Sequence, residues 1–437
     1  MSAPIDLSLL PMTTSVDGSG RMSIGGCDLD ELAAAHGTPL YVYDESDLRA
    51  RCREYLRAFG AGRVAYAGKA FLCVAMARLV EEEGLSLDVA TGGELHVALR
   101  AGFPPERLVF HGNNKSEGEL VAALDAGVGR IVVDSFDEID RLEALVGGGR
   151  RSPAVLVRVT PGVEAHTHEH IETGVEDSKF GLSLERGEAL AAARRIAAGG
   201  RLHLAGLHCH IGSQVFRLDS YALAAQKMAR LVHTVEQETG APVEEVNVGG
   251  GLGVRYVHED APPSISEYAR VVLDGLAAAL SSAGVTSLPR LTVEPGRSIA
   301  GPPGLTLYTV GTIKEIPDLR TYVAVDGGMS DNPRPALYGA AYEVFVPSRA
   351  TEERPLRVTI AGKHCEQGDL LVRDARLPAG LRVGDVVATP CTGAYGASMA
   401  SNYNRVPRSA IVFVCEGSAR VVVRRETLDD LVDLEVG

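Results

Sequence analysis

Eight short apolar segments recur between Arg63 and Arg297, and most end on glycine or on a residue with a chemically useful side chain. The segments are rich in Val, Leu and Ile and do not alternate with polar residues, which is typical of parallel strands buried on both faces. They read RVAYAGKA, LSLDVAT, LVFHGN, RIVVDS, AVLVRVTP, LAGLHCHIG, EVNVGGGLG and LTVEPGR, and begin at residues 63, 85, 108, 130, 154, 204, 245 and 291.

Stretches with helical periodicity separate these segments. They cover residues 71–83, 93–101, 116–126, 137–145, 185–198, 218–238 and 265–283. Eight strands that alternate with helices predict an α/β fold of the (β/α)₈ TIM-barrel type, in which the chemistry lies at the carboxyl ends of the strands. An open doubly wound sheet is the competing architecture, but such sheets usually have fewer strands.

The chain has 437 residues, which is more than one barrel of roughly 250 residues needs. The helical pattern stops near Gly301, and the remaining sequence consists of strand-forming runs separated by Gly, Pro and Asp turns. We therefore predict three parts: an amino-terminal arm over residues 1–37 that joins a β domain, a barrel over residues 38–300, and an all-β carboxyl-terminal domain over residues 301–437.

Charge and apolar content restrict the class of partner. Lys and Arg total 43 against 57 Asp and Glu, and the formal net charge of −14 disfavours nucleic acid and anionic membrane surfaces. No apolar run approaches ~18 residues and no basic leader precedes an apolar core, so we expect a cytoplasmic protein. The seven scattered cysteines contain no CxxC pair, which favours reduced thiols over disulfides or a zinc site.

Residues able to do chemistry cluster at the predicted strand ends. A buried lysine with a lowered pKa can form a Schiff base with an aldehyde, and Lys69 ends the first predicted strand. An ordinary lysine that reaches the barrel rim is an equally good reading of Lys69 alone. The full set at strand ends is Lys69, Asp88, His111, Asn113, His210, Gly249 to Gly251, Glu294 and Arg297.

Three consecutive glycines, Gly249 to Gly251, follow the seventh predicted strand. Glycines let backbone N–H groups approach a phosphate closely, and barrels often bind phosphate after their late strands. Ser213, after the sixth strand, could add a hydroxyl. The sequence is neither a Walker loop nor GxGxxG, so a turn that is glycine-rich for geometric reasons is the alternative.

The eighth predicted strand ends in EPGR. Glu294 could hold a heterocyclic nitrogen in its protonated state, and Arg297 could bind a carboxylate or phosphate through two hydrogen bonds. The alternative is an ion pair between the two residues that closes the barrel. His210 could lie flat against a planar cofactor, although a single histidine on a strand is more often a hydrogen-bonded core residue.

The predicted β domain contains the adjacent pair Cys365 and Glu366. The thiol could donate a proton and the carboxylate could bind an amine, although an ordinary turn explains the segment equally well. The run HTHEH from His166 offers alternate histidines without an evident third ligand, so we expect no metal.

Taken together, ten motifs resemble the diaminopimelate decarboxylase family, in order, from about Asp28 almost to the end of the chain. They are YAGKA, DVATGGEL, HGNNKS, HTHEHIETGVEDSKFG, GLHCHIGSQ, NVGGGLGVRY, EPGRS, VDGGMSDNPRPALYG, GKHCEQGD and CTGAYGASMASNYNRVPR. The resemblance implies a pyridoxal 5'-phosphate-binding barrel of the alanine racemase type followed by a β domain. Two departures, Gln367 where serine is frequent and VTPG where NPG is usual, change no implied role.

The resemblance also implies roles for single residues around the cofactor. Lys69 resembles the lysine that forms the internal aldimine with pyridoxal phosphate, and His210 the histidine stacked on its ring. Glu294 resembles the acid that faces the pyridine nitrogen. The expected cofactor-binding set is Lys69, Asp88, His210, Ser213, Gly249, Gly250, Gly251, Glu294, Gly296, Arg297 and Tyr395.

For the substrate, the resemblance implies that Arg334 and Tyr338 grip the distal end and that Arg297, Glu366 and Tyr395 contact it. Cys365 resembles the proton donor, which gives Lys69, Cys365 and His210 as the catalytic set. In the family Cys365 and Glu366 come from the neighbouring subunit, which implies a homodimer with shared active sites.

The implied reaction is decarboxylation of meso-2,6-diaminopimelate to L-lysine and CO₂, the last step of lysine biosynthesis, through an external aldimine and a quinonoid. Three alternatives stay open. They are a decarboxylase of the same fold for ornithine, arginine or a carboxylated polyamine, a cofactor-binding protein without turnover, and a racemase. Arg334 and Glu366, which would bind a second amino-acid head, disfavour the decarboxylase for ornithine, arginine or a polyamine. The pair Cys365 and Glu366, where racemases of this fold have a tyrosine, disfavours the racemase.

Overall fold

The computed structural model describes residues 4–147, 149–163, 178–286 and 288–436. The chain divides into two compact units, each with its own sheet. The described residues of the barrel unit fall within Cys52–Gly253 and Pro262–Gly296, and those of the β unit within Met1–Arg51, Val254–Ala261 and Arg297–Gly437.

Parallel strands form the centre of the barrel unit, and their order along the sheet is β13-β12-β11-β9-β8-β7-β6-β5. A parallel bridge between Val64 and Val293 joins the first and last strands and closes the barrel. The predicted barrel is therefore confirmed, with every predicted strand present among the described residues. The strands are β5 (Ala65–Ala67), β6 (Ser86–Val89), β7 (Leu108–Phe110), β8 (Arg130–Val133), β9 (Ala154–Thr160), β11 (His203–Cys209), β12 (Glu245–Asn247) and β13 (Arg290–Thr292), and the short β10 (Leu182–Ser183) pairs with β9.

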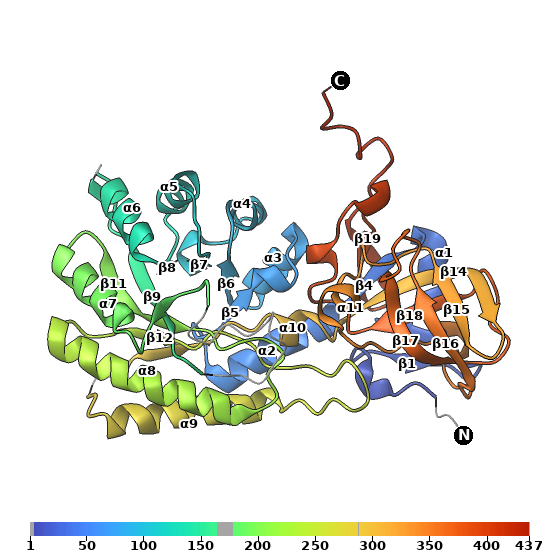
Figure 1. Cartoon of the computed structure of the whole chain (residues 1–437), viewed down its shortest axis with the longest axis horizontal. Helices are drawn as coiled ribbons and strands as arrows, with labels where there is room; N and C mark the ends of the chain where they lie inside the picture. Colours follow the sequence, from blue (N-terminus) through green and yellow to red (C-terminus); the bar gives the residue numbers. More distant parts are fainter. Residues whose placement is uncertain (1–3, 148, 164–177, 287, 437) are drawn as a thin grey trace. The chain divides into compact units, whose positions relative to one another are not determined.

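Helices flank the barrel strands on their outer side (Figure 1). Two of them begin with reciprocal capping boxes, Ser116 with Glu119 and Ser264 with Glu267, which satisfy the first free backbone N–H groups. The helices are α3 (Val74–Glu82), α4 (Gly92–Ala101), α5 (Glu117–Ala126), α6 (Phe136–Gly147), α7 (Glu188–Gly199), α8 (Leu218–Thr239) and α9 (Ile265–Ser282), and α2 (Glu45–Phe59) crosses from one unit into the other.

Small and branched apolar side chains form a packed cluster inside the barrel. Ala65, Val109, Val132, Leu156 and Ala205, each from a different strand, pack together there. Alternate residues of a strand face the same side. The next inward side chains along these strands therefore form a further layer, nearer the carboxyl end of the barrel. That end carries the polar residues of the candidate site.

The β unit contains a second sheet with strand order β17-β16-β15-β14-β4-β19-β20, and β18 pairs with β14. Its long strand β14 pairs with β4 and β18 through its first half and with β15 through its second half. The predicted carboxyl-terminal β domain is thus confirmed. The strands are β4 (Leu40–Asp44), β14 (Gly304–Ile316), β15 (Arg320–Val325), β16 (Leu356–Ala361), β17 (Leu370–Leu377), β18 (Val386–Pro390), β19 (Ala410–Cys415) and β20 (Ser418–Val423), and the short helices α10 (Arg297–Ala300) and α11 (Arg334–Tyr338) lie between them in sequence.

The amino-terminal part of the β unit extends beyond the predicted arm, to Arg51 instead of residue 37. The reason is strand β4, whose five residues are all buried and which pairs with both β14 and β19. Before it lie a small sheet of β1 (Ser15–Val16), β2 (Met22–Ile24) and β3 (Cys27–Asp28), and helix α1 (Leu29–His36).

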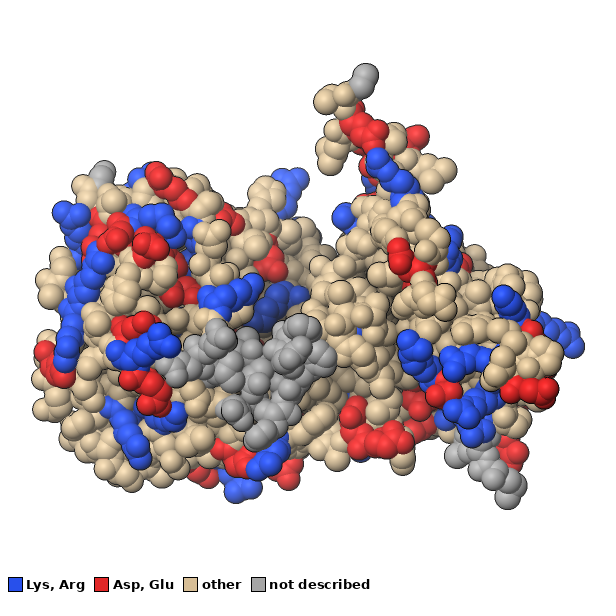
Figure 2. Space-filling model, in the orientation of Figure 1, with Lys and Arg blue, Asp and Glu red and all other residues tan. Residues whose placement is uncertain are grey.

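The surface carries charges of both signs. On the face drawn in Figure 2, Lys and Arg side chains are interspersed with Asp and Glu side chains, in keeping with a chain whose acidic residues outnumber its basic ones. Among the described residues, no helix combines the length and the apolar character that crossing a membrane requires.

Candidate active site

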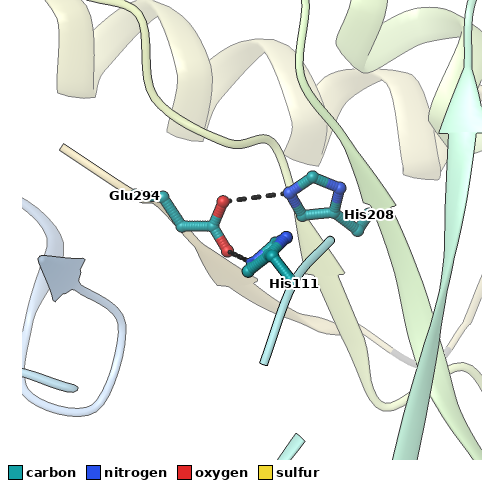
Figure 3. A group of neighbouring side chains, drawn as sticks. All are labelled: His111, His208 and Glu294. Atoms are coloured by element: carbon teal, nitrogen blue, oxygen red, sulfur yellow. Dashed lines mark hydrogen bonds and ion pairs between the residues drawn. The ribbon is translucent and has the colours of Figure 1, made fainter. Parts of the chain in front are cut away.

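A buried carboxylate with three hydrogen-bond donors lies at the carboxyl end of β13. Glu294 Oε1 accepts from Asn247 Nδ2 and from His111 Nε2, each at 2.8 Å, and Oε2 accepts from His208 Nε2 at 2.9 Å. Figure 3 shows the two imidazole rings on the two carboxylate oxygens. We call Glu294, His111, His208 and Asn247 the acid cluster.

The surroundings of Glu294 favour its ionised form. Burial alone would raise the pKa of Glu294, but the nearby His111 and His208 and their hydrogen bonds hold it well below 4.5. Burial lowers the pKa of His208 to about 4, so its ring is neutral at neutral pH. The sequence left open an ion pair between Glu294 and Arg297. Such a pair is not needed to stabilise the buried carboxylate, because His111, His208 and Asn247 already donate hydrogen bonds to its two oxygens.

The side chains of His111, His208 and Glu294 are also close enough together to ligate a metal ion. Each atom that would bind the ion is already used in a hydrogen bond between a ring nitrogen and a carboxylate oxygen. We therefore assign the three residues as a hydrogen-bonded group. The HTHEH segment, which raised the question of metal in the sequence, lies outside the described residues.

Lys69 lies immediately after β5, within the short turn Gly68–Ala70. Burial raises the pKa of Asp88, and the positive charge of Lys69 acts against this. Burial lowers the pKa of His210, and the charge of Lys69 lowers it further. Lys69 is exposed, which agrees with the alternative of a lysine at the barrel rim.

Close backbone packing requires glycine where β12 and β13 end. A Cβ atom on Gly250 would lie 2.1 Å from the carbonyl oxygen of Glu294, and one on Gly251 would lie 2.2 Å from that of Gly212. Gly249 adopts φ +68°, a left-handed conformation that favours glycine. The backbone geometry of this turn therefore requires glycine, as the alternative interpretation of the sequence proposed.

The same loops also present backbone donors. Among the described residues, the amide N–H groups of Gly251 and Gly296 donate to no acceptor, while that of Gly250 donates to His210 Nδ1 at 3.3 Å. Because buried donors are rarely left unsatisfied, such amides at a barrel mouth are suited to an anion. Ser213 follows β11 and is partly buried.

Two buried arginines form a separate group in the β unit. Arg297 Nη1 donates to the hydroxyl of Tyr256, and Arg334 Nη1 to the hydroxyl of Tyr342, both at 2.6 Å. The guanidinium of Arg334 also lies 4.6 Å from the ring centre of Tyr256, and that of Arg297 lies 4.7 Å from the ring centre of Tyr395. We call these five residues the arginine group.

Within the described residues, no carboxylate forms an ion pair with Arg334, which is only 5% exposed. Phenol and ring contacts stabilise this cation, and they raise the pKa of its guanidinium although burial opposes them. A buried cation whose partners are neutral is ready to receive a carboxylate. Tyr338 ends the same short helix, α11, that Arg334 begins.

A third group surrounds Cys365 on an exposed turn of the β unit. The Cys365 thiol lies 3.8 Å from Asn404 Oδ1, and Tyr403 donates to the carboxylate of Glu366. This hydrogen bond raises the pKa of Tyr403. Asp369 fixes the turn, because its carboxylate accepts from the backbone N–H of His364 at 2.8 Å.

The predicted site residues thus fall into groups that the structure describes separately. Lys69, Asp88, His210, the glycines and Glu294 belong to the barrel unit, whereas Arg297, Arg334, Tyr338, Cys365, Glu366 and Tyr395 belong to the β unit.

Sequence reasoning missed His208, Asn247, Tyr256 and Tyr342. A signal existed for His208, because it lies on β11 two residues before His210, which follows the strand, and alternate residues of an extended chain face the same side.

Comparison with known proteins gives one consistent result. Residues 45–301 match the family described as pyridoxal-dependent decarboxylase, pyridoxal binding domain. The chain is 53% identical to a diaminopimelate decarboxylase of Mycobacterium tuberculosis over 98% of this chain and 97% of that protein, and 49% identical to one of Bacillus subtilis over 97% of each. It also resembles the crystal structure of diaminopimelate decarboxylase from M. jannaschii in complex with L-lysine, with TM-score 0.90, 34% identity and 98% of both chains covered.

Proposed function

The chain belongs to the diaminopimelate decarboxylase family of pyridoxal-dependent decarboxylases, and on this premise we propose which of its residues perform each part of the reaction. The enzyme removes CO₂ from meso-diaminopimelate and leaves L-lysine, with pyridoxal phosphate as cofactor. The buried Glu294, whose two carboxylate oxygens accept hydrogen bonds from His111 and His208, is the observation that carries the assignment of residues.

The donor set of the barrel unit fits the cofactor. The amides of Gly251 and Gly296 and the hydroxyl of Ser213 suit the phosphate, Lys69 offers a primary amine, and the anionic Glu294 suits a protonated ring nitrogen. When bound, pyridoxal phosphate supplies an aldehyde that binds amines and a protonated ring that accepts the electron pair left by departing CO₂.

Each barrel residue has a defined task in this proposal. Lys69 would hold the cofactor through its primary amine, which can bond to an aldehyde. His210, whose pKa burial and the Lys69 charge hold well below 6.5, presents a neutral ring that packs against a planar partner. Asp88 lies near Lys69 and His111, where it helps to set the charge of the barrel mouth.

The arginine group recognises the far end of the substrate. Arg334 and Arg297 bind the distal carboxylate, with Tyr338 beside Arg334 on α11, and Glu366 binds the distal ammonium. A substrate without this second amino-acid head would leave buried Arg334 without its anion, and that cost favours diaminopimelate over ornithine or arginine. Tyr395, held at φ +60° against Arg297, contacts both cofactor and substrate.

Cys365 returns a proton to the carbon that loses CO₂. Because Cys365 and Glu366 are exposed on their own unit, we propose a homodimer in which they complete the site of the partner subunit. The described cysteines are all free thiols, in keeping with activity in the reducing cytoplasm.

A substrate panel tests the proposal. Purified protein with pyridoxal phosphate is incubated separately with meso-diaminopimelate, L-ornithine, L-arginine and carboxylated spermidine, and CO₂ and product amine are measured. We expect L-lysine and CO₂ in equal amounts from diaminopimelate and little release from the others. Equal or faster release from ornithine would contradict the assigned role of the arginine group.

A further inference from the structure

We propose that His111 and His208 are positioning residues that keep Glu294 anionic and leave one carboxylate oxygen, Oε2, open for the ring nitrogen of the cofactor. The proposal rests on the role assigned to Glu294 above, as the partner of the ring nitrogen. It adds the two residues that keep the carboxylate of Glu294 charged.

The count of hydrogen bonds identifies the open oxygen. Each carboxylate oxygen has two lone pairs. Oε1 already accepts from His111 and Asn247, whereas among the described residues Oε2 accepts only from His208. One further donor therefore fits on Oε2, and a protonated ring nitrogen is such a donor.

The tautomer of His208 follows from its surroundings. Its Nδ1 is buried and has no hydrogen-bond partner among the described atoms, so a proton on Nδ1 would be a buried, unsatisfied donor. The proton therefore resides on Nε2, which donates to Glu294. Asn247 is oriented in a similar way, because its Oδ1 accepts from the N–H of Gly249 and only its amide nitrogen is left for Glu294.

His111 is held in place by a buried ion pair. Lys115 Nζ lies 2.8 Å from Glu138 Oε1 and also donates to the carbonyl oxygens of Gly112, at 2.7 Å, and Val132, at 2.8 Å. Gly112 is the residue next to His111, so the ion pair fixes the chain where the ring projects toward Glu294.

Among the described residues, Asp88, Lys69 and Arg158 are further charged groups near the acid cluster. Asp88 Oδ1 lies 3.8 Å from His111 Nε2, farther than Glu294 Oε1 at 2.8 Å, so the carboxylate of Glu294 is the acceptor for this ring nitrogen. Lys69 and Arg158 contribute positive charge. The two histidines thus donate hydrogen bonds to the carboxylate of Glu294, and their loss would move the shared proton from the ring nitrogen toward Glu294.

The test measures where that proton resides. Holoenzyme is prepared with cofactor labelled by ¹⁵N at the ring nitrogen, and the ¹⁵N chemical shift is recorded for wild type and for His111→Phe, His208→Phe and His208→Gln. We expect a protonated ring nitrogen in wild type and a shift toward the unprotonated value in both Phe variants. The expected size is about a tenfold change in the proton distribution, equivalent to about 1.4 kcal/mol. His208→Gln, which retains an N–H donor, should restore the wild-type signal.

His203→Gln is the matched control, because His203 lies at the other end of β11 and donates to or accepts from Glu244 at 2.9 Å on the surface. It should leave the signal unchanged. An unchanged signal in both Phe variants with cofactor bound would overturn the proposal. Glu294→Gln separates the two assignments: if it too leaves the ring nitrogen protonated, the role of Glu294 itself is wrong.

A second measurement does not depend on the variants folding or on the cofactor. The ring ¹⁵N signals of histidine-labelled apoprotein report the tautomer of His208 at pH 7.5. We expect a neutral ring protonated on Nε2. A ring protonated on Nδ1, or on both nitrogens, would contradict the proposal.

Discussion

Arg334 donates a 2.6 Å hydrogen bond to the hydroxyl of Tyr342, and the ring of Tyr256 lies 4.6 Å from the same guanidinium. These partners are a phenol hydroxyl and an aromatic ring, so they stabilise the buried cation without forming an ion pair with it. The arrangement leaves Arg334 ready to bind the carboxylate of a ligand.

Arg334→Met should therefore weaken substrate binding more than chemistry. The change keeps much of the side-chain volume and removes the charge, so we expect the KM for diaminopimelate to rise roughly 10- to 100-fold, the loss of a hydrogen bond to a charged group. Steady-state kinetics measures the effect. The matched control is Arg320→Met, which removes an exposed arginine 5.7 Å from the ring of Tyr322. Unchanged kcat/KM in Arg334→Met would remove this residue from substrate recognition.

Lys69→Ala should remove the visible absorbance of the bound cofactor, because no amine at the end of β5 would hold the aldehyde. The spectrum is recorded after loading with pyridoxal phosphate and dialysis. Lys314→Ala changes an exposed lysine of β14 and should leave the spectrum as in wild type. A wild-type spectrum in Lys69→Ala would refute the assignment.

Cys365→Ala should lower kcat about 100-fold, the usual contribution of a positioned proton donor, with the cofactor still bound. Turnover and cofactor absorbance are measured on the same sample. Cys415→Ala, on β19, supplies the control thiol. If Cys365→Ala retained full turnover, another group would have to be the proton donor.

Much of the fold could be predicted because the strands of a parallel barrel are buried on both faces and stand out as apolar runs. Strand β4 was assigned to the barrel instead of the β domain for a physical reason. Strand β4 precedes helix α2 as a barrel strand precedes its helix, and only its pairing with β14 and β19 assigns it to the β unit.

The candidate site was predictable where one motif carries the chemistry, as in EPGR. It was not predictable where the partners come from distant segments. Tyr256 stands between two barrel strands in the sequence, yet it belongs to the β unit and contacts Arg297 and Arg334.

The pH dependence of stability should carry a contribution from Asp331. Burial raises the pKa of Asp331 to about 7, although hydrogen bonds from Tyr308 and the N–H of Gly328 act in the opposite direction. Between about pH 4 and 7 the folded state therefore keeps a proton that the unfolded state has lost, and stability falls as the pH rises through this range.

From pH 5 to pH 8, the Tm of wild type should consequently fall relative to the Tm of Asp331→Asn. The change in the free energy of unfolding that corresponds to this fall is no more than about 4 kcal/mol. Thermal unfolding of both proteins across this range measures it. Asp429→Asn, at an exposed position, should follow the wild-type profile. A constant difference between Asp331→Asn and wild type would show that Asp331 does not titrate in this range.

Mixing two impaired variants tests the central claim most directly, namely that Lys69 of one subunit acts with Cys365 of its partner. Lys69→Ala and Cys365→Ala are each assayed alone, then unfolded, mixed in equal amounts, refolded and assayed with diaminopimelate. Half of the dimers should be hybrids, each with one site that carries both changes and one intact site, so activity should return to about a quarter of the wild-type value. Activity no higher than that of the separate variants, with hybrid dimers present, would contradict the claim.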